Sequence, residues 1–319
     1  MPDLPMTLAV LLGPQRHQPT LRDELARHGI PGPVATITAG WQEREDEDGE
    51  LREHLGGLRS TNLRLHARSD DVYQRDPDLF AAHRAKQDTQ RQLQTLYRRR
   101  LGHALAAAHE VSRADAPEPL IEAEMSAAIM ALRLVDKQHL ARTRTIQRAF
   151  EHDSRPAARP AVEHHFRELQ SILGGCYALL IAGGHVASLL NRMRLFQLDA
   201  LLSSLPRPLP IFAWSAGAMA ITERVVLFHD SPPQGPGNAE IMGEGLGLVR
   251  RIVVLPHANH RLRLDDPTRV SLFARRFRPD RCITLDQGER AAWDGRRWKA
   301  GARQLMPAGE IERREGQRP

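Results

Sequence analysis

Cysteine and lysine are scarce in this sequence of 319 residues. The two cysteines, Cys176 and Cys282, are far apart and offer neither a disulfide framework nor the spacing of a metal site. Only three of the 45 basic residues are lysine, and the excess of arginine and alanine is what GC-rich coding produces. The net charge of +6 is therefore weak evidence for a nucleic-acid partner, and we expect none.

Long apolar runs and cofactor motifs are missing as well. No stretch approaches the roughly 20 apolar residues that span a bilayer, and the apolar segment that ends at Gly13 lacks the flanks of a signal peptide. There is no glycine-rich nucleotide loop and no H-E-x-x-H, and the adjacent His164 and His165 point in different directions on a helix. We expect a cytoplasmic protein with no membrane partner, no cofactor and no metal.

What the sequence does contain is an alternation of strands and helices in its first and last parts. Residues 1–58 predict the first βαβ part of an α/β domain, and residues 161–308 predict the remainder of that domain. Strands are expected at residues 7–13, 33–38, 177–181, 210–214, 251–255 and 281–285, followed by a hairpin at 291–298. The fold class is therefore α/β with a mainly parallel, doubly wound sheet, and residues 309–319 are predicted to be a flexible tail.

The middle of the chain has a different pattern. Residues 59–160 carry leucine and alanine at helical spacing with few β-branched residues, and long helices are expected at 78–110 and 119–150. We interpret this block as a large helical insertion into the α/β domain. It could serve as a lid over the active site, as the arm of a homodimer, or as a surface for a partner.

Ser215 stands where an expected strand meets an expected helix, in the pentapeptide Ala-Trp-Ser-Ala-Gly of residues 213–217. Small neighbours permit the sharp turn of a nucleophile elbow, and the amide of Ala216 would point at an oxyanion. A serine that merely caps the helix would give the same local pattern. The glycine pair that ends the preceding strand could supply a second oxyanion amide.

A nucleophilic serine needs a base and an acid that orients it. His257 ends a later strand and can reach the same sheet edge as Ser215, and Asp230 lies between the two in sequence. The competing candidates for the base are His229 and His260. The competing candidates for the acid are Glu223, Asp265 and Asp286.

The order of these motifs resembles the peptidase E and cyanophycinase family of serine peptidases, within the class I glutamine amidotransferase-like fold. The resemblance rests on the Ala-Gly-Gly strand end, the elbow, Gly-Leu-Gly-Leu at 245–248 and the Pro-His pair, and it covers about residues 171–298. It implies a nucleophile, a base, an acid and two oxyanion amides at Ser215, His257, Asp230, Gly184 and Ala216. Glutaminases of this fold use a cysteine at the elbow, where this chain has serine.

The resemblance also implies a substrate class, since members of the family cleave at aspartate. We therefore expect a serine hydrolase that acts on short peptides or isopeptides at aspartyl residues. The substrate carboxylate needs a cation, for which Arg261 and Arg263 are placed soon after the base, and His185 follows the glycine pair as a further contact. The alternative is a non-catalytic amidotransferase-like scaffold whose helical insertion binds a partner protein or nucleic acid.

Overall fold

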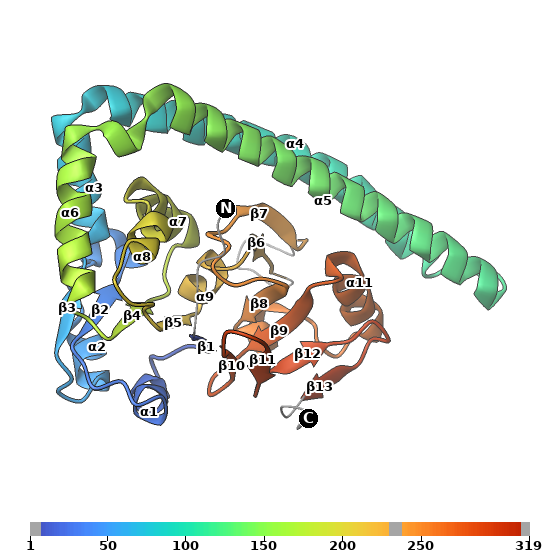
Figure 1. Cartoon of the computed structure of the whole chain (residues 1–319). Helices are drawn as coiled ribbons and strands as arrows, with labels where there is room; N and C mark the ends of the chain where they lie inside the picture. The colour runs from blue at the N-terminus through green and yellow to red at the C-terminus, as the bar shows by residue number, and fades with distance from the viewer. Residues whose placement is uncertain (1–7, 230–237, 314–319) are drawn as a thin grey trace.

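The computed structural model describes residues 8–229 and 238–313. Its centre is a seven-stranded sheet with the order β11-β10-β1-β5-β4-β2-β3 (Figure 1). The strands are β1 (Ala9–Leu12), β2 (Val34–Ile37), β3 (Ser60–Asn62), β4 (Ala178–Ile181), β5 (Ile211–Trp214), β10 (Arg290–Trp293) and β11 (Trp298–Ala300). The first five pair in parallel, and β10 and β11 add an antiparallel edge. The expected mostly parallel sheet of a mixed α/β protein is confirmed.

The central strands are apolar on both faces because the sheet is covered on both sides. In β1, Ala9 and Leu11 belong to one core cluster while Val10 and Leu12 belong to another. Successive side chains of a strand point to opposite faces, so an unbroken apolar run fits a strand between two layers. The covering helices are α1 (Leu21–Arg27), α2 (Gly49–His54), α7 (Val186–Leu195), α8 (Leu198–Ser203) and α9 (Ala216–Ala220), with a 3₁₀ segment η1 (Ala39–Arg44).

The later strands form separate sheets. The elements β8 (Ile252–Pro256), β9 (Arg281–Leu285), β12 (Arg303–Leu305) and β13 (Ile311–Arg313) make a four-stranded sheet, and β6 (Arg224–Leu227) pairs with β7 (Glu240–Glu244). The strands expected at 251–255 and 281–285 are therefore present but lie outside the central sheet, where β5 and β10 already occupy both edges of β1. Ile311 pairs with Leu305, so part of the segment predicted as a flexible tail is a strand.

The helical block differs from its predicted limits of 59–160. Strand β3 still belongs to the central sheet, so the block begins with α3 (Leu65–Arg75) and ends with α6 (Pro160–Gly174), after the 3₁₀ segment η2 (Pro156–Ala158). Between α3 and η2, the helices α4 (Pro77–Val111) and α5 (Glu118–Ser154) form a long antiparallel hairpin. The hairpin passes over β7 and α11 (Pro267–Phe277) and extends beyond them (Figure 1).

None of the helices within residues 8–229 and 238–313 is long and apolar enough to cross a membrane.

Candidate active site

Ser215 occupies the turn between β5 and α9 with a backbone conformation of φ 50° and ψ −122°. Positive φ is unusual for a residue with a side chain and occurs mainly where the surroundings impose it. Here the surroundings are crowded, because a Cβ on Gly183 would lie 2.9 Å from the Cβ of Ser215. The glycine at position 183 therefore lets the two strand ends approach each other at the elbow.

His257 lies at the end of β8, also with positive φ (59°), and begins the short helix α10 (Ala258–Arg261). Its amide donates to the carbonyl of Leu285 at 3.3 Å, which fixes the strand end against β9. Burial lowers the pKa of the His257 imidazole, and the positive charge of Arg261 lowers this pKa further. The imidazole is thus favoured in the neutral form that a general base requires.

Ser215 and His257 line one open cleft of about 790 Å³. Neither side chain makes a hydrogen bond within the described part of the chain, so both are available to a substrate. Hydrogen bonds between catalytic groups are often long in the absence of substrate and shorten when it binds. His229 lines the same cleft, and burial lowers its pKa too, whereas His260 is exposed and does not line it.

The candidates for the acid are differently placed. Asp230 lies outside the described residues. Glu223 accepts a hydrogen bond (2.9 Å) from the amide of Arg251, at the opposite end of β8 from His257. Asp286 accepts from the amide of Asn259 (3.1 Å) and pairs with Arg303 (2.8 Å), and Asp265 is exposed outside the cleft lining.

Two backbone amides are candidates for an oxyanion hole, because Gly184 and Ala216 line the same cleft as Ser215. Ala216 is the first residue of α9, where a helix leaves its N–H groups without internal acceptors. Gly184 has φ 113°, and a Cβ there would lie 2.4 Å from the carbonyl oxygen of Gly40. Among the described residues, no group accepts a hydrogen bond from the Gly184 amide.

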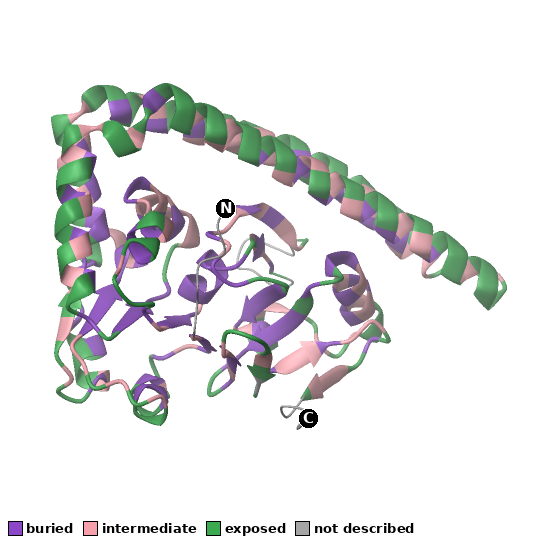
Figure 2. Ribbon diagram, viewed as in Figure 1, coloured by how far each residue is buried: buried purple, intermediate pink, exposed green. Residues whose placement is uncertain are grey.

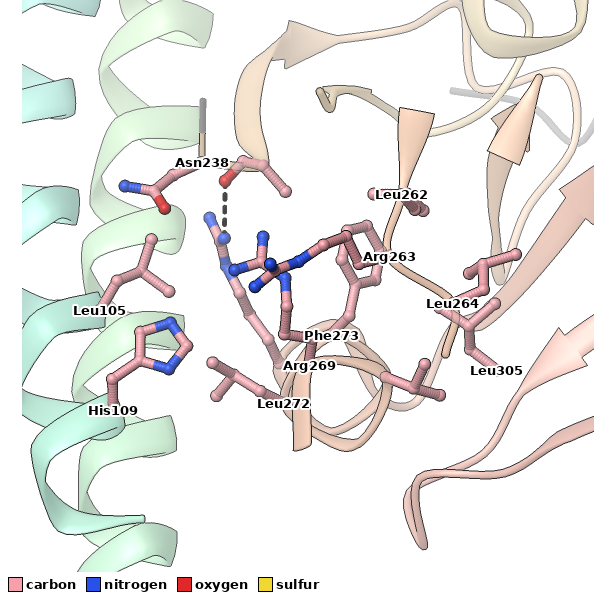
Figure 3. Close-up of a pocket in the computed structure, with 13 residues that line it drawn as sticks. Leu105, His109, Asn238, Leu262, Arg263, Leu264, Arg269, Leu272, Phe273 and Leu305 are labelled. Atoms are coloured by element: carbon pink, nitrogen blue, oxygen red, sulfur yellow. Dashed lines mark hydrogen bonds between the residues drawn. The ribbon is translucent and has the colours of Figure 1, made fainter. Parts of the chain in front are cut away.

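The two arginines expected to contact substrate lie in different places. Arg261 lines the cleft, half-buried, and makes no hydrogen bond or ion pair with the described residues. Arg263 lines a second cavity of about 50 Å³ between α4 and α11, beside Arg269 and His109 (Figure 3). His185 is in the cleft, where its Nδ1 accepts the amide hydrogen of Ser188 at 3.1 Å. The ring proton of neutral His185 is therefore on Nε2, which can donate to a ligand.

Some of the cleft lining was not expected from the sequence. Trp41 and Gly40 of η1 belong to it, and the carbonyl of Gly40 accepts the amide hydrogen of His185 at 2.7 Å. The signal in the sequence is that Gly40 and Trp41 directly follow the strand predicted at 33–38, so they come from the same sheet edge as the serine.

The hairpin also contributes indirectly to the cleft, by holding β7. The phenol oxygen of Tyr97 accepts the amide hydrogen of Ile241, and the side chain of Gln94 donates to the Ile241 carbonyl, each at 3.1 Å. The next residue, Met242, lines the cleft. Two side chains of α4 thus satisfy both backbone groups of Ile241, the residue next to the cleft wall.

A histidine cluster outside the cleft has ligand atoms close enough for a metal ion. Atoms of His164, His165 and Glu168 lie within 4.8 Å of one another. However, the ring of His165 already bonds to Asp71 (2.7 Å) and Arg68 (2.8 Å), and Arg68 also pairs with Glu168. A guanidinium cation within the cluster opposes the binding of a second cation.

Comparison with known proteins identifies the family of this chain. The model of peptidase family S51 matches residues 126–290, more than half of the chain, and this range includes Ser215, His257 and Gly184. No curated protein sequence matches the chain. The crystal structure of a peptidase from an acI-B1 Actinobacterium is similar at a TM-score of 0.47 and 12% identity, with 97% of each chain covered.

Proposed function

Since this chain belongs to peptidase family S51 and is a serine peptidase, we propose that it cleaves short peptides or isopeptides at aspartyl residues through a triad of Ser215, His257 and Asp230. The observation that carries the proposal is the shared cleft, into which the ends of β5 and β8 bring the serine and the histidine. We also assign the α/β part to the class I glutamine amidotransferase-like fold, interrupted by the helical insertion.

The proposed reaction begins when the hydroxyl oxygen of Ser215 attacks the substrate carbonyl and its proton passes to His257. The negative charge that develops on the carbonyl oxygen is stabilised by the amides of Gly184 and Ala216. His257 then returns the proton to the leaving amine as the C–N bond breaks, which leaves an acyl-enzyme. A water molecule, deprotonated by His257, hydrolyses this ester and restores Ser215.

Arg261 is the proposed anchor for the substrate's aspartyl carboxylate. It is the arginine that lines the cleft without an ion-pair partner among the described residues, four positions after His257 on α10. A planar guanidinium can bind a carboxylate through two parallel hydrogen bonds, and partial burial strengthens such a pair. His185, which follows the end of β4 in the same cleft, offers an additional donor.

The first experiment is hydrolysis of a panel of α- and β-aspartyl dipeptides, followed by mass spectrometry, for the native protein and Ser215→Ala. We expect cleavage next to aspartate, reduced at least about a thousandfold in Ser215→Ala. Peptides with asparagine in place of aspartate are the matched substrates. Equal cleavage of both would contradict the aspartyl specificity, and full activity in Ser215→Ala would contradict the nucleophile.

The base is tested by comparing His257→Ala with His229→Ala, because both rings line the cleft. We expect loss of turnover by at least about a hundredfold in His257→Ala, since general acid–base catalysis contributes on this scale. The His229 variant should retain most of the turnover. The opposite ranking would assign the base to His229. As a test of the proposed acid, Asp230→Asn should reduce turnover to a similar extent as His257→Ala.

The carboxylate anchor is tested with Arg261→Gln and, as its matched control, Arg263→Gln on the second cavity. We expect kcat/KM for an aspartyl peptide to fall roughly tenfold to a hundredfold in Arg261→Gln, mainly through KM, because a charge-assisted bidentate contact is lost. Arg263→Gln should have a much smaller effect. A larger loss in Arg263→Gln would show that the substrate carboxylate binds elsewhere.

A further inference from the structure

The hairpin carries most of the large apolar side chains that the described chain leaves exposed. Five of the six are on α4 or α5: Phe80 (40% exposed), Leu96 (58%), Leu120 (53%), Met130 (62%) and Leu134 (53%). Single exposed apolar residues are ordinary on a protein surface, but a concentration on one element indicates an interaction site.

On α5, Met130 and Leu134 belong to an apolar stripe, which Lys137 and Gln138 interrupt before Ala141. Ala123, Ala127, Met130, Leu134 and Ala141 are all exposed, and their spacing of three, four or seven residues places them on one face of the helix. The opposite face of α5 is buried against α4 and the body through a separate set of residues: Met125, Ile129, Leu132, Asp136, His139 and Thr143. Figure 2 shows the outer side of the hairpin as largely exposed along its length. The helix thus has a second apolar face with no partner in the described chain.

The charges beside the stripe have a two-fold pattern. Glu124 and Arg142 are both exposed, and neither has an ion-pair partner among the described residues. They are separated by 18 positions, which is five turns at 3.6 residues per turn, so both lie on the same flank of the stripe. Their midpoint is residue 133, which falls between Met130 and Leu134.

We propose that the outer face of α5 binds α5 of a second copy of this chain, antiparallel, about a two-fold axis near residue 133. In this arrangement Glu124 of each copy lies opposite Arg142 of the other, because an antiparallel pair brings matching flanks together and reverses their order. The large side chains of Met130 and Leu134 then pack across the axis, and the alanines on either side let the helices approach closely. The occupant is a second copy because the charge pattern is self-complementary.

The surface area that the two helices would bury is small, so we expect a reversible dimer. The stripe from Ala123 to Ala141 is about 27 Å long at 1.5 Å per residue, and a helix contact about 11 Å wide buries on the order of 600 Å² in total. Leu96 of α4 widens this apolar face. It lies one helical turn from Arg100, and the Arg100 guanidinium bonds to Gln138 beside the stripe on α5. The total then approaches roughly 1,000 Å², the low end of specific interfaces, where weak and transient contacts are found.

The test is sedimentation velocity of the full chain over a hundredfold range of concentration, because a reversible dimer shifts with concentration. We expect the native chain to dimerise and Leu134→Glu to weaken the dimer at least about tenfold, since it places two carboxylates near the axis. The matched control is Glu53→Arg, a charge reversal at an exposed position of α2 that should leave the dimer unchanged. Circular dichroism checks that each variant folds.

The register is tested by mixing two variants. Glu124→Arg alone creates two Arg–Arg contacts and Arg142→Glu alone creates two Glu–Glu contacts, so each should dimerise at least about tenfold more weakly. An equimolar mixture pairs arginine with glutamate at both positions and should restore the native dimer. A native chain that stays monomeric would overturn the proposal and leave the stripe to a different protein. The proposal would also be overturned if Leu134→Glu left the dimer unaffected. The same holds if the mixture of Glu124→Arg and Arg142→Glu failed to restore the dimer.

Discussion

At the scale of single residues, the ionisation of His257 controls the proposed reaction. Its pKa is lowered first by burial and then by the charge of Arg261, so the imidazole stays neutral to a lower pH than an exposed histidine. The acid limb of kcat/KM should therefore lie below pH 6.5, the ordinary value for histidine. Arg261→Gln removes a positive neighbour, raises the pKa of His257 and should move this limb to higher pH. An unchanged limb in pH–rate profiles would show that another group controls it.

Gly184 is a second position where an added carbon atom tests the proposed site. A methyl group there would meet the Gly40 carbonyl at 2.4 Å, at φ 113°. Gly184→Ala should cost about 1–3 kcal/mol in stability and reduce kcat by about a hundredfold or more through displacement of an oxyanion donor. Gly57→Ala is the matched control, since Gly57 also has positive φ (86°) but nothing within 4 Å of the added carbon. Urea unfolding and steady-state kinetics separate the two effects, and wild-type kcat in Gly184→Ala would refute its role.

At the scale of elements, a buried ion pair attaches the hairpin to the rest of the chain. Arg276 of α11 donates to both carboxylate oxygens of Asp136 on α5 at 2.7 Å, and also to the carbonyl of Ala239. Asp136→Ala would leave this guanidinium buried without its carboxylate and should cost about 3–5 kcal/mol in urea unfolding. The control is Glu122→Ala, whose exposed pair with Arg275 should contribute less than about 1 kcal/mol. Similar losses in both variants would contradict the importance of burial.

At the scale of the whole molecule, the cleft is assembled from segments far apart in the chain. Its lining includes Trp41 near the start, Ser215 in the middle and Arg261 near the end. An aspartyl peptide bound to Ser215→Ala should therefore slow amide hydrogen exchange in all three segments, while the hairpin tip near Ala114 keeps its exchange rate. Protection confined to one segment, measured by mass spectrometry, would contradict a binding site shared among them.

Local features of the sequence determined the elements and the candidate chemistry of this protein. The apolar run at residues 7–13 predicts a doubly covered strand, and small residues around Ser215 predict a sharp turn, because both depend on neighbours in the chain. The glycine pair at 183 and 184 and the histidine at a strand end are visible for the same reason. These patterns suffice for an α/β protein with a proposed serine nucleophile.

Only the tertiary structure decided which elements associate and which side chains share a cavity. Nothing local distinguishes Arg261 from Arg263, yet the first lines the cleft and the second lines a cavity under the hairpin. The separation of β8 and β9 from the central sheet, and the bonds from Tyr97 to Ile241, likewise join residues far apart in sequence. Such contacts depend on the packing of the whole chain, so local periodicity and turn chemistry carry no information about them.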